Sequence, residues 1–341
     1  MTIKTGLLGV SGYTGQVLLN LLLDHPVFDI KRIFSTSFEG PIEKLHSNMF
    51  DTRCPDVQTF DITICEELDL IFLAVPHTKA MPIVRDLNRR FPLLKIVDLS
   101  ADFRHDDVSV FKQYYADEHH SEDLMSRFIY GIPEINRSEL KSAQYCANPG
   151  CYAIASILGV LPFADQLKEN QLLVIDAKSG VSGAGKVLKE NTLFCEVNDA
   201  MSAYATGSHR HVPEIQSSLG HQNLVFSPHL IPQSRGELCS IYIANDQNVT
   251  QEELLKLYNA YYQDHPFVRI AGPDETSNTK TVVGSNCCVI KPLISKDSNT
   301  ICVFSCIDNL LKGASGQAIQ NFNLMFGLDE VSGLTTVARY L

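Results

Sequence analysis

Two short segments of this 341-residue chain combine residue types that can carry out covalent and proton-transfer chemistry. The first is the run NPGCY, in which Pro149 and Gly150 predict a turn that places Cys151 in the first turn of a helix. The dipole and free N–H groups of a helix start favour a thiolate, although the sequence alone does not determine the pKa of Cys151. A cysteine at a helix start is more often structural, and a catalytic role therefore requires a partner.

That partner is expected in SHRHVPEI, which begins at Ser208 and gathers two imidazoles, a guanidinium and a carboxylate. A thiol needs a base to ionise and its tetrahedral adduct needs an acid, so we expect His211 or His209 to transfer the proton. Arg210 and Glu214 are expected to contact substrate. Two histidines could also bind a metal, but no third ligand stands at a recognisable spacing, so no metal is predicted.

A glycine-rich turn between an apolar run and a helix pattern is the next candidate site. The turn GVSGYTG can hold a pyrophosphate on its backbone N–H groups and on the following helix start. Its spacing is not the strict G-x-G-x-x-G fingerprint, and a purely structural turn is the alternative. The residues expected to contact a dinucleotide are Gly9, Ser11, Gly12, Tyr13, Thr14 and Gly15.

The end of the second strand pattern bears on which dinucleotide is bound. In NAD-preferring sites an acidic residue holds the ribose 2′-hydroxyl here, whereas this chain has Ser35, Thr36 and Ser37. Hydroxyl groups tolerate a 2′-phosphate, and the nearby cations Arg32 or Lys44 would attract it. The sequence therefore favours NADP, although an acidic residue at position 39 weakens the preference.

Two further loops follow expected strands. The small-residue run SGVSGAGK lets backbone approach a ligand, and we expect Ser179, Gly180 and Gly183 to contact the cofactor and Ser182 the substrate. It lacks the register of a phosphate-binding P-loop. The run DLSADFR ends a strand at the sheet edge where such folds bind ligands, and Arg104 is either a phosphate ligand or the partner of a neighbouring aspartate.

The elements that position these residues divide the chain in two. Strand patterns at 3–10, 28–34, 68–75 and 95–99 alternate with helix patterns at 16–23 and 80–91, which predicts a Rossmann-like parallel sheet. After residue 149 the pattern changes to a helix and widely spaced strands, which predicts an α+β domain with a mixed sheet. The expected elements there are a helix at 151–161, strands at 172–179, 236–243, 282–292 and 300–306, and a last helix at 313–326.

Composition excludes several classes of protein. The formal net charge of −11 argues against nucleic-acid binding, which needs a concentrated basic face. No apolar run approaches the roughly 20 residues that cross a bilayer, and no signal-peptide pattern precedes the first strand. The ten cysteines are scattered without metal-ligand spacing and are expected to be reduced. We therefore expect a cytoplasmic protein that binds neither nucleic acid nor membrane.

Nine segments in order resemble the N-acetyl-gamma-glutamyl-phosphate reductases, a family of the aspartate-semialdehyde dehydrogenase superfamily. They are GVSGYTG at Gly9, DLSADFR at Asp98, YGIPE at Tyr130, NPGCY at Asn148, SGVSGAGK at Ser179, HRHVPEI at His209, PHLIPQSRG at Pro228, VVGSNCCVI at Val282 and DNLLKGASGQAIQ at Asp308. The resemblance covers nearly the whole chain, and its cysteine and histidine motifs are intact.

The resemblance implies an NADP-binding domain at 1–148 plus 313–341 and a catalytic and oligomerisation domain at 149–312. It implies that Cys151 is the nucleophile of an acyl-phosphate reductase in arginine biosynthesis, which forms a thioester, releases phosphate and makes an aldehyde. It also implies that Asn148 contacts substrate, that Asn309 and the small-residue loop lie near the nicotinamide, and that the subunit forms a dimer or tetramer.

Rival interpretations remain open. An aspartate-semialdehyde dehydrogenase-like enzyme would reduce another acyl phosphate, but the HRHVPEI segment favours the acetylglutamyl compound. A Cys-His hydrolase or transferase would use the same thiol and imidazole without needing the glycine turn. A non-catalytic dinucleotide sensor would need the turn but not Cys151 together with the histidines.

Overall fold

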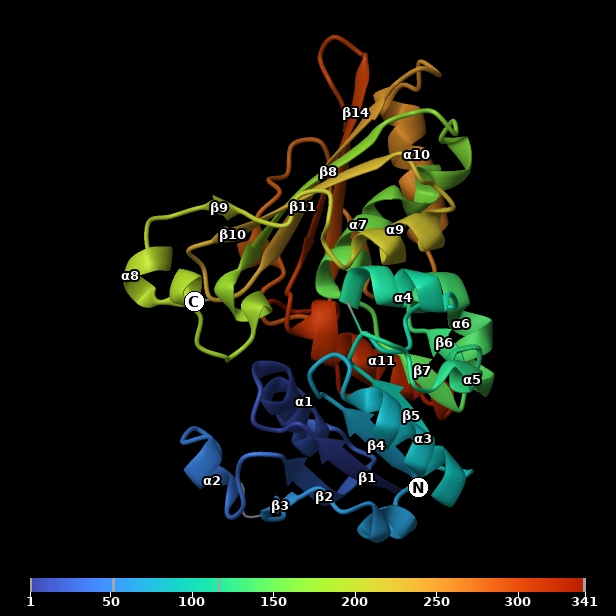
Figure 1. Ribbon diagram of the computed structural model, residues 1–341. Coiled ribbons are helices and arrows are strands. Elements are labelled where there is room, and N and C mark those ends of the chain that lie inside the picture. The colour runs from blue at the N-terminus through green and yellow to red at the C-terminus, as the bar shows by residue number, and fades with distance from the viewer. Residues whose placement is uncertain (1, 51–52, 116, 340–341) are drawn as a thin grey trace. The chain divides into compact units, whose positions relative to one another are not determined.

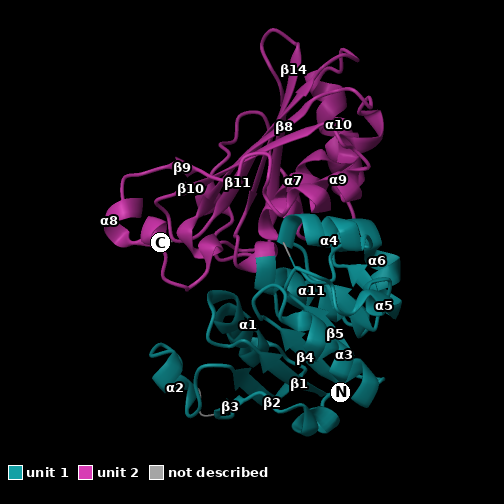
Figure 2. Ribbon diagram, viewed as in Figure 1, with its two compact units in different colours: residues 1–149, 314–334 teal, residues 150–313, 335–341 magenta. Residues whose placement is uncertain are grey.

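The computed structural model describes residues 2–50, 53–115 and 117–339, which form two compact units (Figure 2). The first unit comprises residues 1–149 and 314–334, and the second comprises 150–313 and 335–341. The predicted domain boundaries lie one residue earlier at both junctions, and the prediction had put 335–341 in the first domain. The assignment of cofactor binding to one unit and catalysis to the other stays a prediction.

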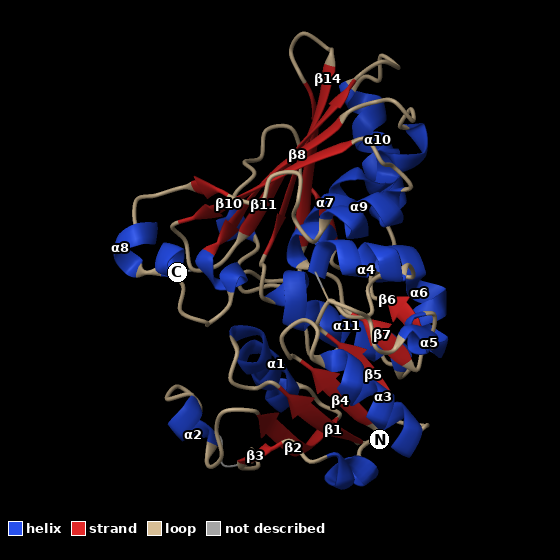
Figure 3. Cartoon of the chain, in the orientation of Figure 1, coloured by secondary structure: helices blue, strands red, loops and turns tan. Residues whose placement is uncertain are grey.

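Among the described residues, the first unit contains a sheet of seven strands in the order β3-β2-β1-β4-β5-β7-β6, all paired in parallel (Figures 1 and 3). The strands are β1 (Ile3–Leu8), β2 (Phe28–Ser35), β3 (Val57–Thr59), β4 (Leu70–Leu73), β5 (Lys95–Asp98), β6 (Phe128–Tyr130) and β7 (Tyr145–Ala147). The helices are α1 (Tyr13–Asp24), α2 (Ile42–Leu45), α3 (Ala80–Arg90), α4 (Val108–Tyr115), α5 (Glu122–Met125), α6 (Pro133–Ser142) and α11 (Gly316–Met325). The predicted Rossmann-like sheet is confirmed.

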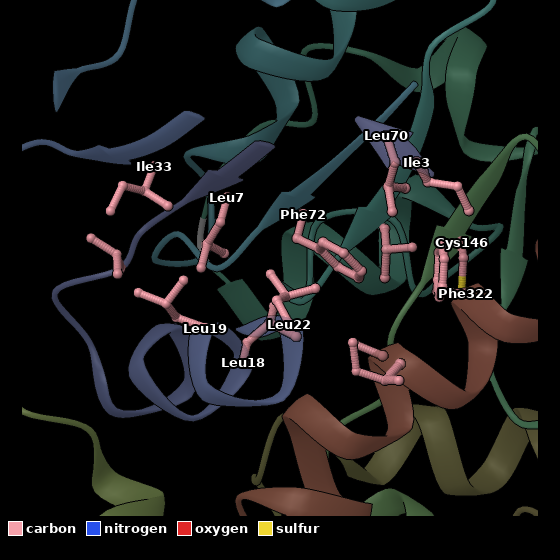
Figure 4. Packing of buried hydrophobic residues seen from close by; sticks show 14 of the residues in the cluster. Ile3, Leu7, Leu18, Leu19, Leu22, Ile33, Leu70, Phe72, Cys146 and Phe322 are labelled. Carbon is pink, nitrogen blue, oxygen red and sulfur yellow. The ribbon is translucent and has the colours of Figure 1, made fainter. Parts of the chain in front are cut away.

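The core of this unit explains why its strands have consecutive apolar residues in the sequence. Leu7 on β1 and Phe72 on β4 are fully buried and pack with Leu18 and Leu22 of α1 (Figure 4). The last helix, α11, comes from the far end of the sequence and adds Phe322 to the same cluster. Because helices shield the sheet from water, the parallel strands can be apolar on both faces.

Among the described residues, the second unit contains a mixed seven-stranded sheet in the order β12-β13-β14-β11-β8-β10-β9. Two pairs, β8 with β10 and β12 with β13, are parallel, and the others are antiparallel. The strands are β8 (Leu173–Gly180), β9 (Ser202–Ala203), β10 (Leu224–Ile231), β11 (Glu237–Ala244), β12 (Val268–Ile270), β13 (Cys288–Ile294) and β14 (Thr300–Ile307). The helices are α7 (Cys151–Val160), α8 (Phe194–Val197), α9 (Val212–Leu219) and α10 (Gln251–Tyr262). The predicted mixed sheet is confirmed.

Helix α7 is the central helix of the second unit. Its residues from Tyr152 to Val160 are all buried, because the helix packs against β11, β14 and α9. A helix that is apolar on every side belongs in a protein interior. Gly150 is the N-cap residue in extended conformation, with φ −77° and ψ 150°. The buried body of the helix therefore holds its first residue, Cys151, in a fixed place.

One predicted strand begins later than expected. The sequence predicted a strand from residue 282, but β13 begins at Cys288. Gly284 has φ +83° and donates its N–H to Asp308 Oδ2 at 2.8 Å, which holds a turn where the strand was expected. None of the helices in the described part of the chain has both the length and the apolar character that a bilayer crossing requires.

Candidate active site

Cys151 is the first residue of α7, and the residue as a whole is half-buried. A Cβ added at Gly313 would come within 2.8 Å of the Cβ of Cys151, so a residue without a side chain is needed beside the thiol. The N–H groups in the first turn of a helix have no partner within the helix. No side chain caps them at Gly150, so they can bind an oxygen held near the thiol.

The imidazole of His211 packs directly against the residue before the thiol. A Cβ added at Gly150 would lie 2.2 Å from His211 Nε2, so only glycine allows this approach. Glu214 joins the same two residues, because its Oε2 accepts the Gly150 N–H at 3.1 Å and its Oε1 lies 3.9 Å from His211 Nε2. The predicted cysteine and HRHVPEI motifs are thus adjacent at the start of α7.

His209 has a different environment. Its Nδ1 accepts the backbone N–H of His211 at 3.2 Å, and its ring lies edge-on to Tyr152 and Tyr204 at 5.5 and 5.6 Å between centroids. Burial, assisted by the charge of Arg210, lowers the pKa of His209 to about 4, so this imidazole is neutral near pH 7. The Arg210 residue itself is exposed. These contacts suit His209 to supporting the loop that carries His211.

The helix start does not by itself set the pKa of Cys151. Burial raises the pKa of the thiol well above its usual value, and the charge of Glu237 raises it further. The backbone N–H of Tyr152 favours the thiolate, as expected at a helix start, but it is outweighed. Sequence reasoning considered the helix dipole alone and missed the carboxyl. The resting thiol is therefore protonated near neutral pH, and its ionisation must accompany the reaction.

Glu237 is the first residue of β11, paired with Ser179 on β8 and Ile307 on β14. It is 0% exposed, and neither carboxyl oxygen makes a hydrogen bond of good geometry among the described residues, although the Cys151 thiol and the Ser179 hydroxyl interact with it. Burial raises the pKa of Glu237 to about 8, while interactions with the Cys151 thiol and the Ser179 hydroxyl partly oppose the shift. The sequence feature that could have indicated Glu237 is a glutamate at the first position of a mostly apolar strand pattern.

The small-residue loop after β8 is linked through the Asn309 side chain to the segment that precedes β11. The side chain of Asn309 donates from Nδ2 to Ser182 Oγ at 2.8 Å and accepts the Gly236 N–H at 2.8 Å. A Cβ at Gly180 would come within 2.8 Å of the Gln233 carbonyl oxygen, so glycine permits this close approach. Of the residues predicted here, Ser179, Gly180, Ser182 and Asn309 lie together, and a Cβ at Gly183 would approach Ser179 Oγ to 3.0 Å.

The glycine turn between β1 and α1 has a shape suited to a phosphate ligand. Gly9 has φ +101°, and a Cβ at Gly15 would lie 2.1 Å from the Gly9 carbonyl oxygen, so both positions require glycine. Gly12 is the N-cap residue of α1, and no side chain caps the helix there. A Cβ at Gly12 would meet only the Gly9 oxygen, at 3.9 Å. The turn therefore offers open space and uncapped N–H groups, which fits a dinucleotide pyrophosphate.

The predicted 2′-phosphate region lies at the end of β2. Ser35 is buried and its Oγ accepts the Ser37 N–H at 3.1 Å, while Thr36 and Ser37 are exposed. Arg32 pairs with Glu67 at 2.6 Å. Because Glu39 accepts hydrogen bonds from the N–H and hydroxyl of Thr59, its carboxylate is held against β3. Of the two predicted cations, Lys44 is exposed on α2 and better suited to meet a phosphate.

Arg104 and Asn148 make structural contacts in the first unit. Arg104 donates from Nε to the Asn148 carbonyl at 2.8 Å and from Nη2 to the Leu99 carbonyl at 3.1 Å. The Asn148 side chain donates to the Ala314 carbonyl and accepts from Asn321 Nδ2, both at 3.1 Å. These bonds fix the chain that leads to Pro149. The described residues contain no cluster of three or more His, Cys, Asp or Glu that could hold a metal ion.

Each of the two units matches a known protein family. Residues 4–143 match the family described as semialdehyde dehydrogenase, NAD binding domain, and residues 151–309 match semialdehyde dehydrogenase, dimerisation domain. N-acetyl-gamma-glutamyl-phosphate reductase of Desulforudis audaxviator is 41% identical over 99% of this chain and 99% of its own length. The chain belongs to the N-acetyl-gamma-glutamyl-phosphate reductase family. The enzyme of the same name from Halothermothrix orenii is 39% identical, again over 99% of both chains.

The reductase family shares its fold with more distant proteins of known structure. Aspartate semialdehyde dehydrogenase with NADP from Candida albicans superposes with a TM-score of 0.68, at 12% identity, over 95% of this chain and 98% of the other. At that identity the likeness concerns the fold alone. The recognition of the family from nine ordered motifs is confirmed by the full-length relatives.

Proposed function

We propose that the protein reduces N-acetyl-gamma-glutamyl phosphate to N-acetylglutamate 5-semialdehyde with NADPH and releases phosphate, as a step of arginine biosynthesis. The observation that carries this proposal is the His211 imidazole packed against the residue before the Cys151 thiol, which the Glu214 carboxylate joins to the same helix start. Thiol, imidazole and uncapped N–H groups at one helix start suit acyl transfer. The names of the full-length relatives supply the substrate.

In this mechanism Cys151 attacks the acyl carbon and forms a thioester, which divides one difficult reduction into two easier steps. The uncapped N–H groups in the first turn of α7 stabilise the oxyanion of the tetrahedral adduct. His211, oriented by Glu214, donates the proton that the departing phosphate requires. His209 supports the backbone of His211 through its Nδ1.

NADPH, when bound, supplies the hydride that reduces the thioester. The turn from Gly9 to Gly15 would hold its pyrophosphate on uncapped N–H groups. Thr36 and Ser37 would surround the 2′-phosphate, with Lys44 as its cation. The match of residues 4–143 to an NAD-binding domain supports this choice, as does the Candida albicans enzyme of the same fold, whose crystal structure was solved with NADP.

The reverse reaction separates this proposal from its rivals. We expect the protein to reduce NADP with N-acetylglutamate semialdehyde in the presence of phosphate, and to act far less with aspartate semialdehyde. Higher activity with the aspartyl compound would assign the protein to the other substrate. Release of phosphate from the acyl phosphate at the same rate without NADPH would instead identify a hydrolase.

We also propose that the protein is a cytoplasmic homo-oligomer with its subunit contact in the second unit. The match of residues 151–309 to a dimerisation domain supports the contact. Large apolar side chains are exposed in this unit between residues 187 and 201, including Leu188 and Phe194 at 88% and 76% exposure. Ten free cysteines suit a reducing compartment.

A further inference from the structure

Glu237 is an unusual residue for the place it occupies. The next two residues along β11, Leu238 and Cys239, are apolar, and Glu237 is fully buried with neither carboxyl oxygen hydrogen-bonded among the described residues. A buried carboxyl without a partner destabilises a fold by several kcal/mol when it is ionised. Buried titratable groups with strongly shifted pKa values are concentrated at functional sites.

The groups around Glu237 limit what it can do. Cys151 and Tyr152 at the start of α7 interact with its charge, as does Tyr204. Cys239 lies two residues on along β11, and Asp308 lies just beyond the end of β14. Asp308 is paired with Arg235 at 3.0 Å, so this cation is already engaged. The side chains that favour the charged form of the Glu237 carboxyl are the Cys151 thiol and the Ser179 hydroxyl. Of these two, only the thiol loses a proton in the proposed reaction.

We infer that Glu237 is a further catalytic residue of this site, whose carboxylate accepts the Cys151 thiol proton during attack on the acyl phosphate and returns it when the aldehyde leaves. This inference rests on the proposed function and adds a second proton-transfer group to it. Glu237 is fully buried, whereas His211 is only partly buried and contacts the helix start through Gly150.

Atoms and charges balance in this sequence of steps. The S–H proton moves to Glu237 as the sulfur–carbon bond forms, and the carbon–oxygen bond to phosphate then breaks while His211 protonates the phosphate. After the thioester has been reduced by the hydride that bound NADPH would supply, the sulfur–carbon bond breaks to release the aldehyde and the Cys151 thiolate. The thiolate takes its proton back from Glu237. The one proton consumed overall enters through His211 and leaves on phosphate.

The inference explains how a thiol with a raised pKa becomes a nucleophile. Ionisation of Cys151 into a buried site beside a carboxylate would place two negative charges together, which is unfavourable. Transfer of the proton from thiol to carboxylate as the sulfur–carbon bond forms avoids any state in which both groups carry a negative charge. Burial raises the pKa of Glu237 to about 8, so the carboxylate form that can accept the proton increases as pH rises through about 8.

The test compares Glu237→Gln with the wild type and with the control Glu252→Gln, which makes the same chemical change on the exposed face of α10. We expect wild-type kcat/KM to rise with pH through about 8. In Glu237→Gln it should fall by about 100-fold or more, in the range typical of a lost general base, and the rise near pH 8 should disappear. Glu252→Gln should match the wild type.

A second readout excludes a merely structural role. Removing the negative charge should make the Cys151 thiol ionise at lower pH, measured as thiolate absorbance with Cys151→Ser subtracted. Easier ionisation with slower turnover supports proton acceptance by Glu237. Unchanged or faster turnover in Glu237→Gln would overturn the inference, because the carboxyl would then only suppress the thiolate.

The test remains decisive if the variant fails to fold, and it distinguishes this inference from the proposed function. If Glu237→Gln does not fold, the wild-type profile decides alone, and a kcat/KM without a rise near pH 8 overturns the inference. The thiol titration uses no substrate, so it is separate from the proposed function. A wild type that shows no acyl-phosphate-dependent oxidation of NADPH contradicts the function, whereas an unshifted thiol titration in Glu237→Gln contradicts the coupling of Glu237 to Cys151.

Discussion

The two histidines of the HRH segment stand two residues apart and have different environments. The His211 ring contacts the helix start at Gly150 and lies near the Glu214 carboxylate, which suits it to proton transfer. Burial keeps His209 neutral, and its Nδ1 supports the His211 backbone. The sequence could not separate their roles, because both lie in one short motif and differ only in what the folded chain packs around them.

Substitution of each histidine by asparagine tests this assignment. His211→Asn removes the proton donor, and we expect kcat to fall by about 10²- to 10⁴-fold. His209→Asn keeps an oxygen that can accept the His211 N–H, so its kcat should fall by no more than about tenfold, a loss of about 1.4 kcal/mol. Steady-state assays of both variants provide the comparison, and a larger loss in His209→Asn would reverse the roles.

The sequence indicated candidate site residues that lie within local motifs, and it did not indicate a residue that reaches the site through strand pairing. Cys151 was singled out by the residues directly before it, Pro149 and Gly150. The HRH segment was singled out because two histidines, an arginine and a glutamate occur within a few residues. Glu237 reaches the thiol only because β11 pairs with β8 and α7 packs on this sheet. That register arises from contacts more than 50 residues apart in the sequence, which a one-dimensional pattern does not record.

Among the elements, α7 has the largest influence on the site. Its buried apolar body fixes the position of Cys151, and the glycine before it allows the His211 imidazole to approach. Strands with long apolar runs, such as β1 and β14, were predicted with bounds close to those observed. Strand β10 was missed, because Pro228 and His229 interrupt its apolar pattern.

At the scale of elements, we predict that Gly150→Ala impairs catalysis by displacing His211. The new Cβ would fall 2.2 Å from Nε2, and the overpacking should lower stability by about 1–3 kcal/mol. Gly272→Ala is the matched control, since its Cβ would meet only Glu275 Oε1 at 3.6 Å, and its stability should change by less than about 0.5 kcal/mol. Denaturant unfolding with kcat measurements tests both, and full activity in Gly150→Ala would contradict the placement of His211.

The whole chain separates its chemical groups between two units. The glycine turn and hydroxyl residues lie in the first unit, and the thiol, imidazole and buried carboxyl lie in the second. The change in strand pattern near residue 149 was visible in the sequence, because parallel and mixed sheets have different spacing of apolar runs. The association of 335–341 with the second unit was not predicted, since this short tail has no regular pattern.

At this scale we predict that the exposed apolar residues of the second unit form the subunit contact. Leu188→Glu or Phe194→Glu should reduce the mass measured by light scattering to that of a monomer, because a buried unpaired charge opposes association. Leu93→Glu changes an equally exposed leucine, at 90% exposure in the first unit, and should leave the mass unchanged. A wild type that is already monomeric would contradict the prediction.

The central claim is that Cys151 carries the acyl group, and trapping of the thioester tests it most directly. Incubated with the acyl phosphate in the absence of NADPH, the protein should release one phosphate per subunit in a burst. Mass spectrometry should then find the N-acetylglutamyl group on Cys151, and addition of NADPH should discharge it as aldehyde. An equal burst in Cys151→Ser, or an acyl group on another residue, would contradict the account.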